Sequence, residues 1–331
     1  MEMTQTHIIS RDQSKLSLLI KQIRFEANGI NSYELVHPQG EELPPFSAGA
    51  HIDIILPNGI VRQYSLCNSP GERHRYVIAV LRDEKGRGGS KTLHDALRVQ
   101  DLAQVSAPRN NFALVPEAKK VILLAGGIGV TPLKSMAHAL DQAGIPFELH
   151  YCARNPGCAA FREELGIAWQ HGKLVHHFDH GQPEQGLDIA ALLREQEEGT
   201  HLYYCGPAGF MKACAEASSH WAAGTVHFEH FKAPEPAADT AALAPGAFMV
   251  KIASSGAMLE VPADRSIADV LEQNNIRIET SCQAGLCATC KIRYLEGEVD
   301  HRDYILGDDE HGQFLTACVS RATSPVLVLD L

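Results

Sequence analysis

Short apolar segments separated by turn residues make up the first 112 residues of the chain. Within each segment hydrophobic and polar side chains tend to alternate, which is the period of two expected for a strand with one buried face. Proline and glycine groups such as Pro44-Pro45, Pro57-Asn58-Gly59 and Pro70-Gly71 separate the segments, and these residues favour turns. Short strands at this spacing predict an antiparallel barrel or sandwich. The predicted strands are 16–25, 32–37, 51–56, 61–66 and 76–81.

From residue 113 to residue 231, apolar runs alternate with stretches of helical periodicity. The run 121–125 reads Val-Ile-Leu-Leu-Ala, which suits a central parallel strand. Thr131 is expected to cap, and Pro132 to open, a helix that follows this strand. Further strands are predicted at 147–152 and 201–205, and a second helix is expected to run to about Trp221. This order predicts an α/β domain with a parallel sheet.

Residues 232–246 form a predicted tether between this region and the rest of the chain. The segment contains three prolines and many alanines but almost no bulky apolar side chain, so it cannot build a core. Residues 247–331 are expected to form a compact domain, a small mixed sheet that holds one helix. Ser266 has the character of a helix N-cap. The predicted strands of this domain are 248–253, 258–261, 291–295 and 326–329.

Composition and charge narrow the classes of protein that fit. The chain has 331 residues, 40 acidic against 29 lysine and arginine side chains, and a net charge of −11. Such a balance argues against a general nucleic-acid role. The longest apolar run, 121–130, contains three glycines and is too short to span a bilayer. No secretory signal is visible at the amino terminus, so a cytoplasmic location is expected.

Four of the nine cysteines form a recognisable pattern. Cys282, Cys287 and Cys290 have the spacing C-x4-C-x2-C, and Cys318 follows after a long gap. This is the spacing of a plant-type [2Fe–2S] site, in which a single loop supplies three of the four thiolates. Structural zinc is an alternative, although it favours two short pairs; uncoordinated thiols are another. The other five cysteines, which stand singly and fit a reducing compartment, are at positions 67, 152, 158, 205 and 214.

Two stretches of the first region suggest a phosphate-bearing flat cofactor. Arg62-Gln63-Tyr64-Ser65 offers a cation, a ring and a hydroxyl group. Gly88-Gly89-Ser90 runs into a predicted short helix, whose first amide groups and Ser90 are suited to a phosphate. Each stretch alone also fits an ordinary strand or surface loop. Their position upstream of a nucleotide-binding pattern favours the cofactor interpretation.

That nucleotide-binding pattern consists of two glycine-rich turns that follow predicted parallel strands. The first is Gly126-Gly127-Ile128-Gly129-Val130-Thr131-Pro132, and the second is Cys205-Gly206-Pro207. Turns of this kind bind pyrophosphate and ribose. Because Pro132 replaces the last glycine of G-x-G-x-x-G, the first turn is a weak motif by itself. The two turns together, about seventy residues apart, are a stronger signal.

With these motifs in this order, the chain resembles the one-chain reductases of Rieske-type aromatic oxygenases, of the phthalate dioxygenase reductase and vanillate O-demethylase reductase type. The resemblance covers nearly the whole chain. It implies an FMN-binding antiparallel β-barrel at 1–112 and a ferredoxin–NADP reductase-like NAD-binding α/β domain at 113–231. A linker at 232–246 and a C-terminal β-grasp plant-type ferredoxin domain at 247–331 complete the expected fold.

The resemblance also implies roles for individual residues. Ser65, Cys205 and Glu229 are expected to position the reacting groups rather than to act as nucleophiles. Gln283 and Ala288 depart from related loops, which often carry Arg and either Gly or Ser there. The four cysteines are the implied cluster ligands. The residues expected to bind FMN or the pyridine nucleotide are Arg62, Gln63, Tyr64, Ser65, Ala79, Val80, Gly88, Gly89, Ser90, Gly127, Gly129, Thr131, Pro132, Cys205, Gly206, Pro207 and Phe228.

The implied function is an oxidoreductase that takes electrons from NADH through FMN and the cluster to a Rieske-type terminal oxygenase or demethylase in aromatic compound catabolism. Two alternatives stay open: a non-catalytic ferredoxin-like redox sensor, and an FAD-dependent reductase of a non-Rieske hydroxylase. An acidic stretch beyond the cysteine loop suggests either a solvated face or a docking surface for a basic partner. Its members are Glu296, Glu298, Asp300, Asp303, Asp308, Asp309 and Glu310.

Overall fold

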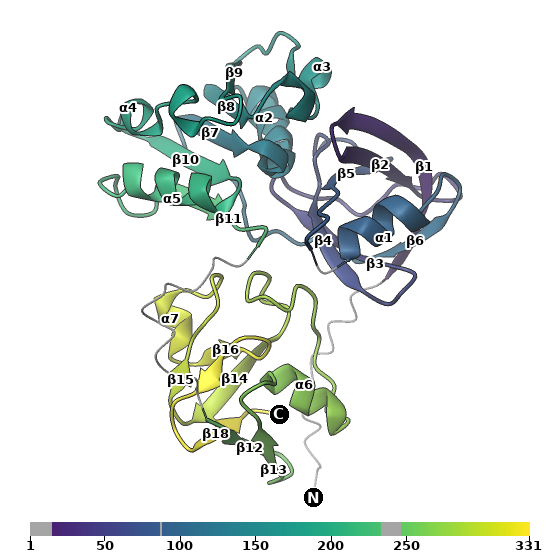
Figure 1. The fold of residues 1–331 in the computed structure, drawn as a ribbon, viewed down its shortest axis with the longest axis vertical. Helices are drawn as coiled ribbons and strands as arrows, with labels where there is room; N and C mark the ends of the chain where they lie inside the picture. Colours follow the sequence, from purple (N-terminus) through teal and green to yellow (C-terminus); the bar gives the residue numbers. More distant parts are fainter. Residues whose placement is uncertain (1–14, 87, 233–245) are drawn as a thin grey trace, which may run out of the picture.

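The computed structural model describes residues 15–86, 88–232 and 246–331. The predicted tether 232–246 therefore lies outside the described residues, except for its two end positions. Figure 1 shows three lobes, each built around a sheet of its own. Successive segments of the chain form the three lobes, and one buried apolar cluster joins the first two, with Ala27 and Cys67 on one side and Val121 on the other.

The first lobe is an antiparallel six-stranded sheet with the strand order β4-β3-β6-β1-β2-β5. A bridge between Leu66 and Ile78 joins the end of β4 to β5, which closes the sheet into the predicted barrel. A buried cluster of aliphatic residues and Tyr33 and Tyr76 fills it. Its elements are β1 (Leu16–Ala27), β2 (Ile30–Val36), β3 (His51–Ile55), β4 (Val61–Ser65), β5 (Tyr76–Leu81), α1 (Gly89–Ala96) and β6 (Leu102–Val105).

The second lobe is a five-stranded parallel sheet with the order β11-β10-β7-β8-β9. The chain runs outward from β7 to β9 and then returns to the other side of β7, so the order reverses between β7 and β10. Ligands bind at such a switch point. The elements are β7 (Lys120–Gly126), η1 (Gly127–Gly129), α2 (Val130–Ala143), β8 (Phe147–Ala153), η2 (Pro156–Cys158), α3 (Arg162–Leu165), β9 (Gly172–Phe178), η3 (Pro183–Gln185), α4 (Ile189–Leu192), β10 (Thr200–Cys205), α5 (Ala208–Ala217) and β11 (Val226–Glu229).

Two helix boundaries in this lobe differ from the prediction. Helix α2 begins at Val130 with Gly129 as its N-cap, so Thr131 and Pro132 lie inside the first turn. The preceding 3-10 turn η1 starts the helical path earlier than the Thr-Pro signal indicates, and the Thr131 hydroxyl donates back to the Ile128 carbonyl at 3.1 Å. Helix α5 ends at Ala217, four positions before Trp221.

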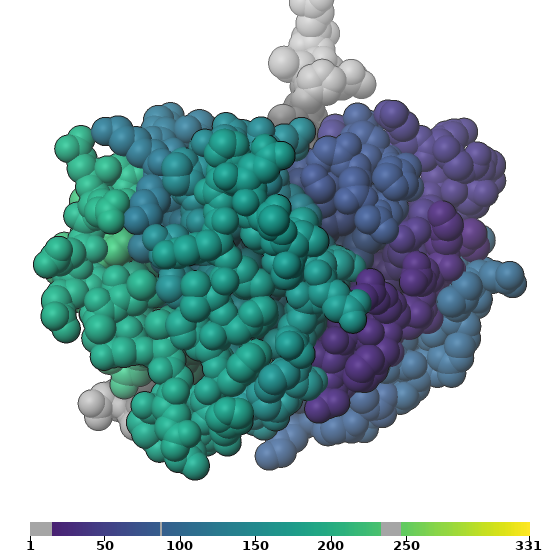
Figure 2. All heavy atoms as spheres, turned by 90° about the horizontal axis from the view of Figure 1, so that it is seen from above, coloured from purple at the N-terminus to yellow at the C-terminus, as the bar shows by residue number. Residues whose placement is uncertain are grey.

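Charged groups join the first two lobes. The Lys134 ammonium of α2 donates to the Cys67 carbonyl at 3.0 Å and lies 3.0 Å from the Glu164 carboxylate. Arg24 of β1 reaches the same carboxylate at 3.1 Å. Figure 2 shows the two lobes in close contact along this side. Because Lys134 is buried, these partners are needed to satisfy its charge.

The third lobe is a mixed sheet with the order β13-β12-β18-β14-β16, in which β12 and β18 are parallel. Helix α6 packs on it, with Ser266 as its N-cap in a capping box with Asp269, as predicted. The elements are β12 (Phe248–Ile252), β13 (Met258–Val261), α6 (Ile267–Gln273), β14 (Lys291–Glu296), β15 (Val299–Asp300), α7 (Asp308–His311), β16 (Phe314–Thr316), β17 (Arg321–Ala322) and β18 (Val326–Leu329). Its loops at the upper edge face the junction of the other lobes (Figure 1).

Candidate cofactor-binding and electron-transfer site

The amino end of α1 and strand β4 together make an anion-binding corner. Gly88 is the N-cap, at φ +85°, and no side chain caps the helix. A Cβ at Gly89 would overlap the Arg62 side chain, so only glycine lets the guanidinium lie against this turn. Uncapped amides beside a guanidinium favour a phosphate. The Ser90 hydroxyl accepts from the Asp83 amide at 3.0 Å, so its predicted phosphate contact stays a prediction.

The side-chain amide nitrogen of Gln63 is placed to bind a ligand. Its Nε2 is buried and has no hydrogen-bond acceptor among the described residues. An orphaned buried amide is costly, whereas the carbonyl and ring nitrogen atoms of a flavin would satisfy it. Ala79 and Val80 lie buried in β5, which the Leu66–Ile78 bridge brings next to β4. The residues of β4 and β5 therefore fit the flavin ring that the sequence predicts there.

Ser65, Cys205 and Glu229 come together at the meeting point of the first two lobes. Cys205 and Glu229 are paired neighbours at the ends of β10 and β11, and the Ser65 hydroxyl donates to Glu229 Oε2 at 3.4 Å. Burial raises the pKa of Glu229 to about 8, which favours the protonated form of this carboxyl group at neutral pH. The pKa of the Cys205 thiol lies well above its usual value, mainly because the thiol is buried and secondly because Glu229 is nearby. A thiol held neutral in this way suits positioning, not nucleophilic attack.

The two glycine-rich turns pack backbone against backbone at the switch point. A Cβ at Gly129 would overlap the Cys205 carbonyl group. A Cβ at Gly206 would lie 3.0 Å from the Gly126 Cα, and one at Gly126 would lie 2.9 Å from Pro207 Cδ. Glycines are needed here because the turns must approach one another and a bound pyrophosphate closely. Thr131 and Pro132, in the first turn of α2, are buried beside them.

Gly129→Ala should weaken NADH binding by about tenfold or more and lower stability by about 1–3 kcal/mol, because the new methyl group forces the two turns apart. Nucleotide titration and thermal unfolding measure the two effects. Gly209→Ala is the matched control, since a Cβ at Gly209 of α5 meets no atom within 4 Å. Equal NADH affinity in both variants would show that the close approach of the turns is dispensable.

An aromatic path runs from the parallel sheet to the third lobe. Phe228 is 46% exposed and stacks on Tyr204 with ring centroids 5.4 Å apart. His230 lies edge-on to Phe228 at 5.2 Å and to Tyr304 at 5.8 Å. The Tyr304 amide donates to the Gly285 carbonyl of the cysteine loop at 2.9 Å. The predicted site residue Phe228 is therefore linked to the segment that carries the cluster ligands.

The four cysteine sulfurs lie as two pairs, Cys282 with Cys287 and Cys290 with Cys318. Within the described residues, no three of these sulfurs lie inside 4.8 Å of one another. A tetrahedral zinc ion with Zn–S bonds of about 2.3 Å would place all four sulfurs about 3.8 Å apart. The paired arrangement fits two irons with two thiolates each, so the donor set favours the [2Fe–2S] cluster over zinc.

The loop backbone is shaped around these sulfurs. The amides of Ala284 and Leu286 both point at Cys282 Sγ at 3.4 Å, and such hydrogen bonds tune the reduction potential. Contact between the two sulfurs lowers the pKa of Cys287 and raises that of Cys282, so the pair releases its first proton readily and holds the second. The Thr289 side chain also contacts Cys287 and lowers the pKa of that thiol.

Gln283 and Ala288, the two departures from related loops, both have left-handed backbone, at φ +51° and φ +54°. A side chain with a Cβ is strained there by about 1–2 kcal/mol. Ala288→Gly should therefore raise the stability of the holoprotein by about 0.5–1 kcal/mol, after allowing for the entropy of glycine. Thermal loss of the cluster absorption measures it. Ala284→Gly, at a position without positive φ, should lower the temperature at which half of the cluster absorption is lost. If both variants lowered this temperature, backbone strain at Ala288 would be contradicted.

A clamp that the sequence analysis missed holds the cysteine loop against the barrel. The Ser281 hydroxyl donates to Asp53 Oδ1 at 2.7 Å, and this contact is buried. Arg109 holds the other carboxylate oxygen of Asp53 at 2.7 Å, and Asn111 Nδ2 donates to the Cys287 carbonyl at 3.3 Å. Asp53 is the cross-strand partner of Gln63. The cysteine loop therefore docks beside the predicted flavin residues.

Comparison with known proteins agrees with this geometry. Residues 250–323 match the family model of the 2Fe-2S iron-sulfur cluster binding domain, and residues 123–216 match that of the oxidoreductase NAD-binding domain. The reductase subunit of tert-butanol monooxygenase / tert-amyl alcohol desaturase from Aquincola tertiaricarbonis is 52% identical, over 98% of this chain and 99% of that protein. The phthalate dioxygenase reductase of Burkholderia cepacia is 46% identical, over 92% and 94%.

A vanillate O-demethylase oxidoreductase from a Pseudomonas strain is 45% identical, over 96% of this chain and all of that protein. A solved structure of phthalate dioxygenase reductase, described as a modular structure for electron transfer from pyridine nucleotides to [2Fe–2S], aligns with a TM-score of 0.73 at 44% identity. The alignment covers 97% of this chain and 99% of that one.

Fold, site and similarity together define a pyridine-nucleotide-dependent flavin and iron–sulfur oxidoreductase. The chain belongs to the family of oxygenase reductase components that includes phthalate dioxygenase reductase and vanillate O-demethylase oxidoreductase. The predicted class, the order of folds and the cofactor set of FMN, a [2Fe–2S] cluster and NADH are confirmed. No helix of the described ranges is long and apolar enough to cross a bilayer.

Proposed function

We propose that this chain takes electrons in pairs from NADH and delivers them singly, through FMN and the [2Fe–2S] cluster, to a Rieske-type terminal oxygenase or demethylase. The observation that carries the proposal is the clamp of Ser281 on Asp53, beside Gln63. It brings the cysteine loop to the wall of the barrel that the flavin would occupy. Similarity to reductase subunits of oxygenases and a demethylase supports the choice of acceptor.

FMN, when bound, supplies the conversion between a two-electron hydride and single electrons. The chain supplies position and electrostatics. Arg62 and the α1 amides would hold the phosphate, and Gln63 would donate to the ring edge. Ser65 and the protonated Glu229 would orient the reacting face of the nucleotide, since both lie where the barrel meets the parallel sheet.

We propose the division 1–112, 113–231 and 247–331 as the functional units, each built on one sheet. We also propose a cytoplasmic location. Its support is that the five cysteines outside the proposed cluster form no disulfide in the structure, which fits a reducing compartment.

Anaerobic titration with NADH, combined with release and identification of the flavin, tests the proposal. Flavin and iron–sulfur absorption should bleach together, and the released flavin should be FMN. Released FAD would favour a reductase of another hydroxylase class. A protein that shows cluster bands only, unmoved by NADH or NADPH, would instead be a redox sensor.

Only some carboxylates of the acidic stretch are available to contact a partner. Asp303 is wholly buried, so it cannot belong to a docking face. Asp300 pairs with Arg302, and Glu310 pairs with Lys291. We propose that the remaining exposed carboxylates steer a basic face of the oxygenase toward the cluster; they are Glu296, Glu298, Asp308 and Asp309.

Reversing both charges in Asp308→Lys/Asp309→Lys should slow electron delivery to the oxygenase by roughly tenfold at low ionic strength. The salt dependence of this rate should flatten, and NADH oxidation with ferricyanide should not change. Coupled turnover across a salt series measures the effect. The control, Glu184→Lys/Glu195→Lys, makes the same charge change on exposed residues of the parallel-sheet lobe. If the salt dependence of electron delivery did not change in Asp308→Lys/Asp309→Lys, the docking proposal would be wrong.

A further inference from the structure

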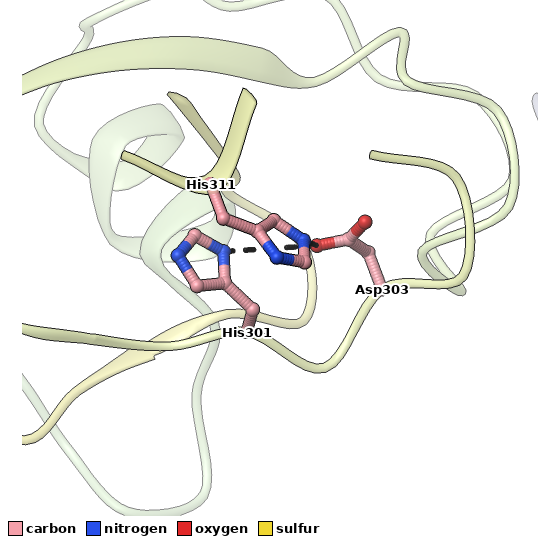
Figure 3. Close-up of side chains that lie close together, drawn as sticks. All are labelled: His301, Asp303 and His311. Carbon is pink, nitrogen blue, oxygen red and sulfur yellow. Dashed lines mark ion pairs between the residues drawn. The ribbon is translucent and has the colours of Figure 1, made fainter. Parts of the chain in front are cut away.

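Three side chains beyond the cysteine loop converge on one point. His301 follows β15, Asp303 lies in the next loop, and His311 is the last residue of α7. Figure 3 shows both imidazole rings directed toward the Asp303 carboxylate. The two rings are stacked with their centroids 4.0 Å apart. No role in the proposed electron path uses this group.

The converging atoms lack hydrogen-bond partners. His301 Nδ1, His311 Nε2 and Asp303 Oδ2 are all buried with no hydrogen bond within the described residues. The Asp303 side chain is 0% exposed. Its Oδ2 lies 3.9 Å from His301 Nδ1 and 3.8 Å from His311 Nε2, too far for hydrogen bonds. Burying a carboxylate oxygen without a close partner destabilises the folded protein. A species bound between these atoms would remove that cost.

A divalent metal ion fits that place. All three donor atoms lie within 4.8 Å of one another. Ligands about 2.1 Å from a tetrahedral ion are about 3.4 Å apart. Because the two rings are nearly parallel, they would have to rotate so that their nitrogen atoms converge on the ion. Two imidazoles and one carboxylate suit zinc and other first-row transition metals. A fourth position is left for water.

The surrounding contacts hold the carboxylate in place for such an ion. Asp303 Oδ1 accepts from the amides of Leu306 at 2.8 Å and Ile305 at 3.3 Å, which turns Oδ2 toward the imidazoles. Asp308 Oδ1 lies 3.9 Å from His311 Nδ1, the nitrogen that faces away from Asp303. At 3.9 Å it makes no hydrogen bond, but rotation of the exposed Asp308 side chain would bring it to the outer nitrogen, where a ligating histidine usually has such a partner.

We propose that His301, Asp303 and His311 bind a divalent transition-metal ion, separate from the cysteine cluster. The ion would tie α7 to the loop that packs on the cluster segment. That loop is in close contact with the cysteine loop, because a Cβ at Gly285 would lie 2.9 Å from the Asp303 Cα. The metal would therefore hold fixed the segment that links the cluster to the exposed Asp308 and Asp309.

Zinc binding to the flavin- and cluster-loaded protein tests the proposal. The protein is treated with a mild chelator, its iron and flavin contents are measured, and Zn²⁺ is added. Elemental analysis should find one zinc ion per chain with no loss of iron. His311→Gln and His301→Gln should each weaken zinc binding at least tenfold. His74→Gln, an exposed histidine of the barrel lobe, is the control and should bind zinc like the unaltered protein.

Two results would overturn the site. If the unaltered protein and both variants bound zinc equally, or if none of the three bound it, the two histidines would not form a metal site. Zinc taken up only as iron is lost would assign the ion to the cysteines. The heat stability of the α7 segment, followed by hydrogen exchange, gives a readout independent of activity. Zinc should slow exchange there in the unaltered protein and not in His311→Gln.

Discussion

Cys290→Ser should block electron output through the cluster while leaving NADH oxidation by the flavin in place. Cys290 and Cys318 form one of the two sulfur pairs, so the substitution removes a thiolate from one iron. Losing even the groups that support metal ligands costs about 10–100-fold, and loss of a ligand should cost at least that much. NADH-dependent reduction of cytochrome c, for which the cluster supplies the electrons, should fall by about a hundredfold. Reduction of ferricyanide, a small acceptor that can take electrons from the flavin directly, should stay near its original rate.

Cys158→Ser is the control for this prediction, because Cys158 lies outside the cysteine loop, in η2 of the parallel-sheet lobe. It should leave both activities and the iron content unchanged. If Cys290→Ser lost its iron but still reduced cytochrome c at the original rate, electrons would leave the chain from the flavin, and the cluster would not lie on the path.

Asp53→Ala should uncouple the cysteine loop from the barrel. Asp53 accepts from Ser281 and pairs with Arg109, so its removal loses the clamp and leaves a guanidinium without its closest carboxylate. Hydrogen bonds to charged groups are worth about 1.5–3 kcal/mol, which corresponds to a fall of roughly 10–100-fold in docked protein. Stopped-flow absorption should show flavin reduction by NADH at the original rate, followed by slower reduction of the cluster.

Ser281→Ala tests the same clamp from the other side with a smaller perturbation. If both residues act through one contact, the double variant should be no slower than Asp53→Ala alone. Ser255→Ala is the matched serine control, since Ser255 Oγ only accepts from the nearby Ala257 amide. Fully additive losses in the double variant would mean that Asp53 and Ser281 act separately.

Local patterns predicted the parts of the fold that local forces determine. The strands at 76–81 and 326–329 have the predicted bounds, because each is an apolar run ended by turn residues. The short strands β6 and β9 were missed. Four residues in β6 show too few alternations. In β9 every residue except the exposed Lys173 is partly buried, and three of its seven positions are polar, so no clear alternation is seen. Thr131 was wrong as a cap because the preceding glycines already follow a helical path.

The missed parts of the site depend on contacts between distant segments. Asp53 and Ser281 are 228 positions apart, and nothing near either residue indicates the other. The burial of Asp303 was equally hidden, because a carboxylate in an acidic stretch is usually solvated. His301 and His311 have no recognised metal-ligand spacing, and only the turn of α7 brings them together. Sequence motifs identified the cofactors, whereas the relation between the lobes required coordinates.

The position of β18 has a consequence for how the protein is made. This strand, Val326–Leu329, is the last one described, yet it lies in the middle of the third sheet, between β12 and β14. That sheet cannot be completed on the ribosome until Leu329 has been added. The barrel and the parallel sheet use only earlier residues, so they can fold first as the chain emerges. Flavin loading can thus precede cluster assembly, because the cysteine loop belongs to the sheet that is completed last.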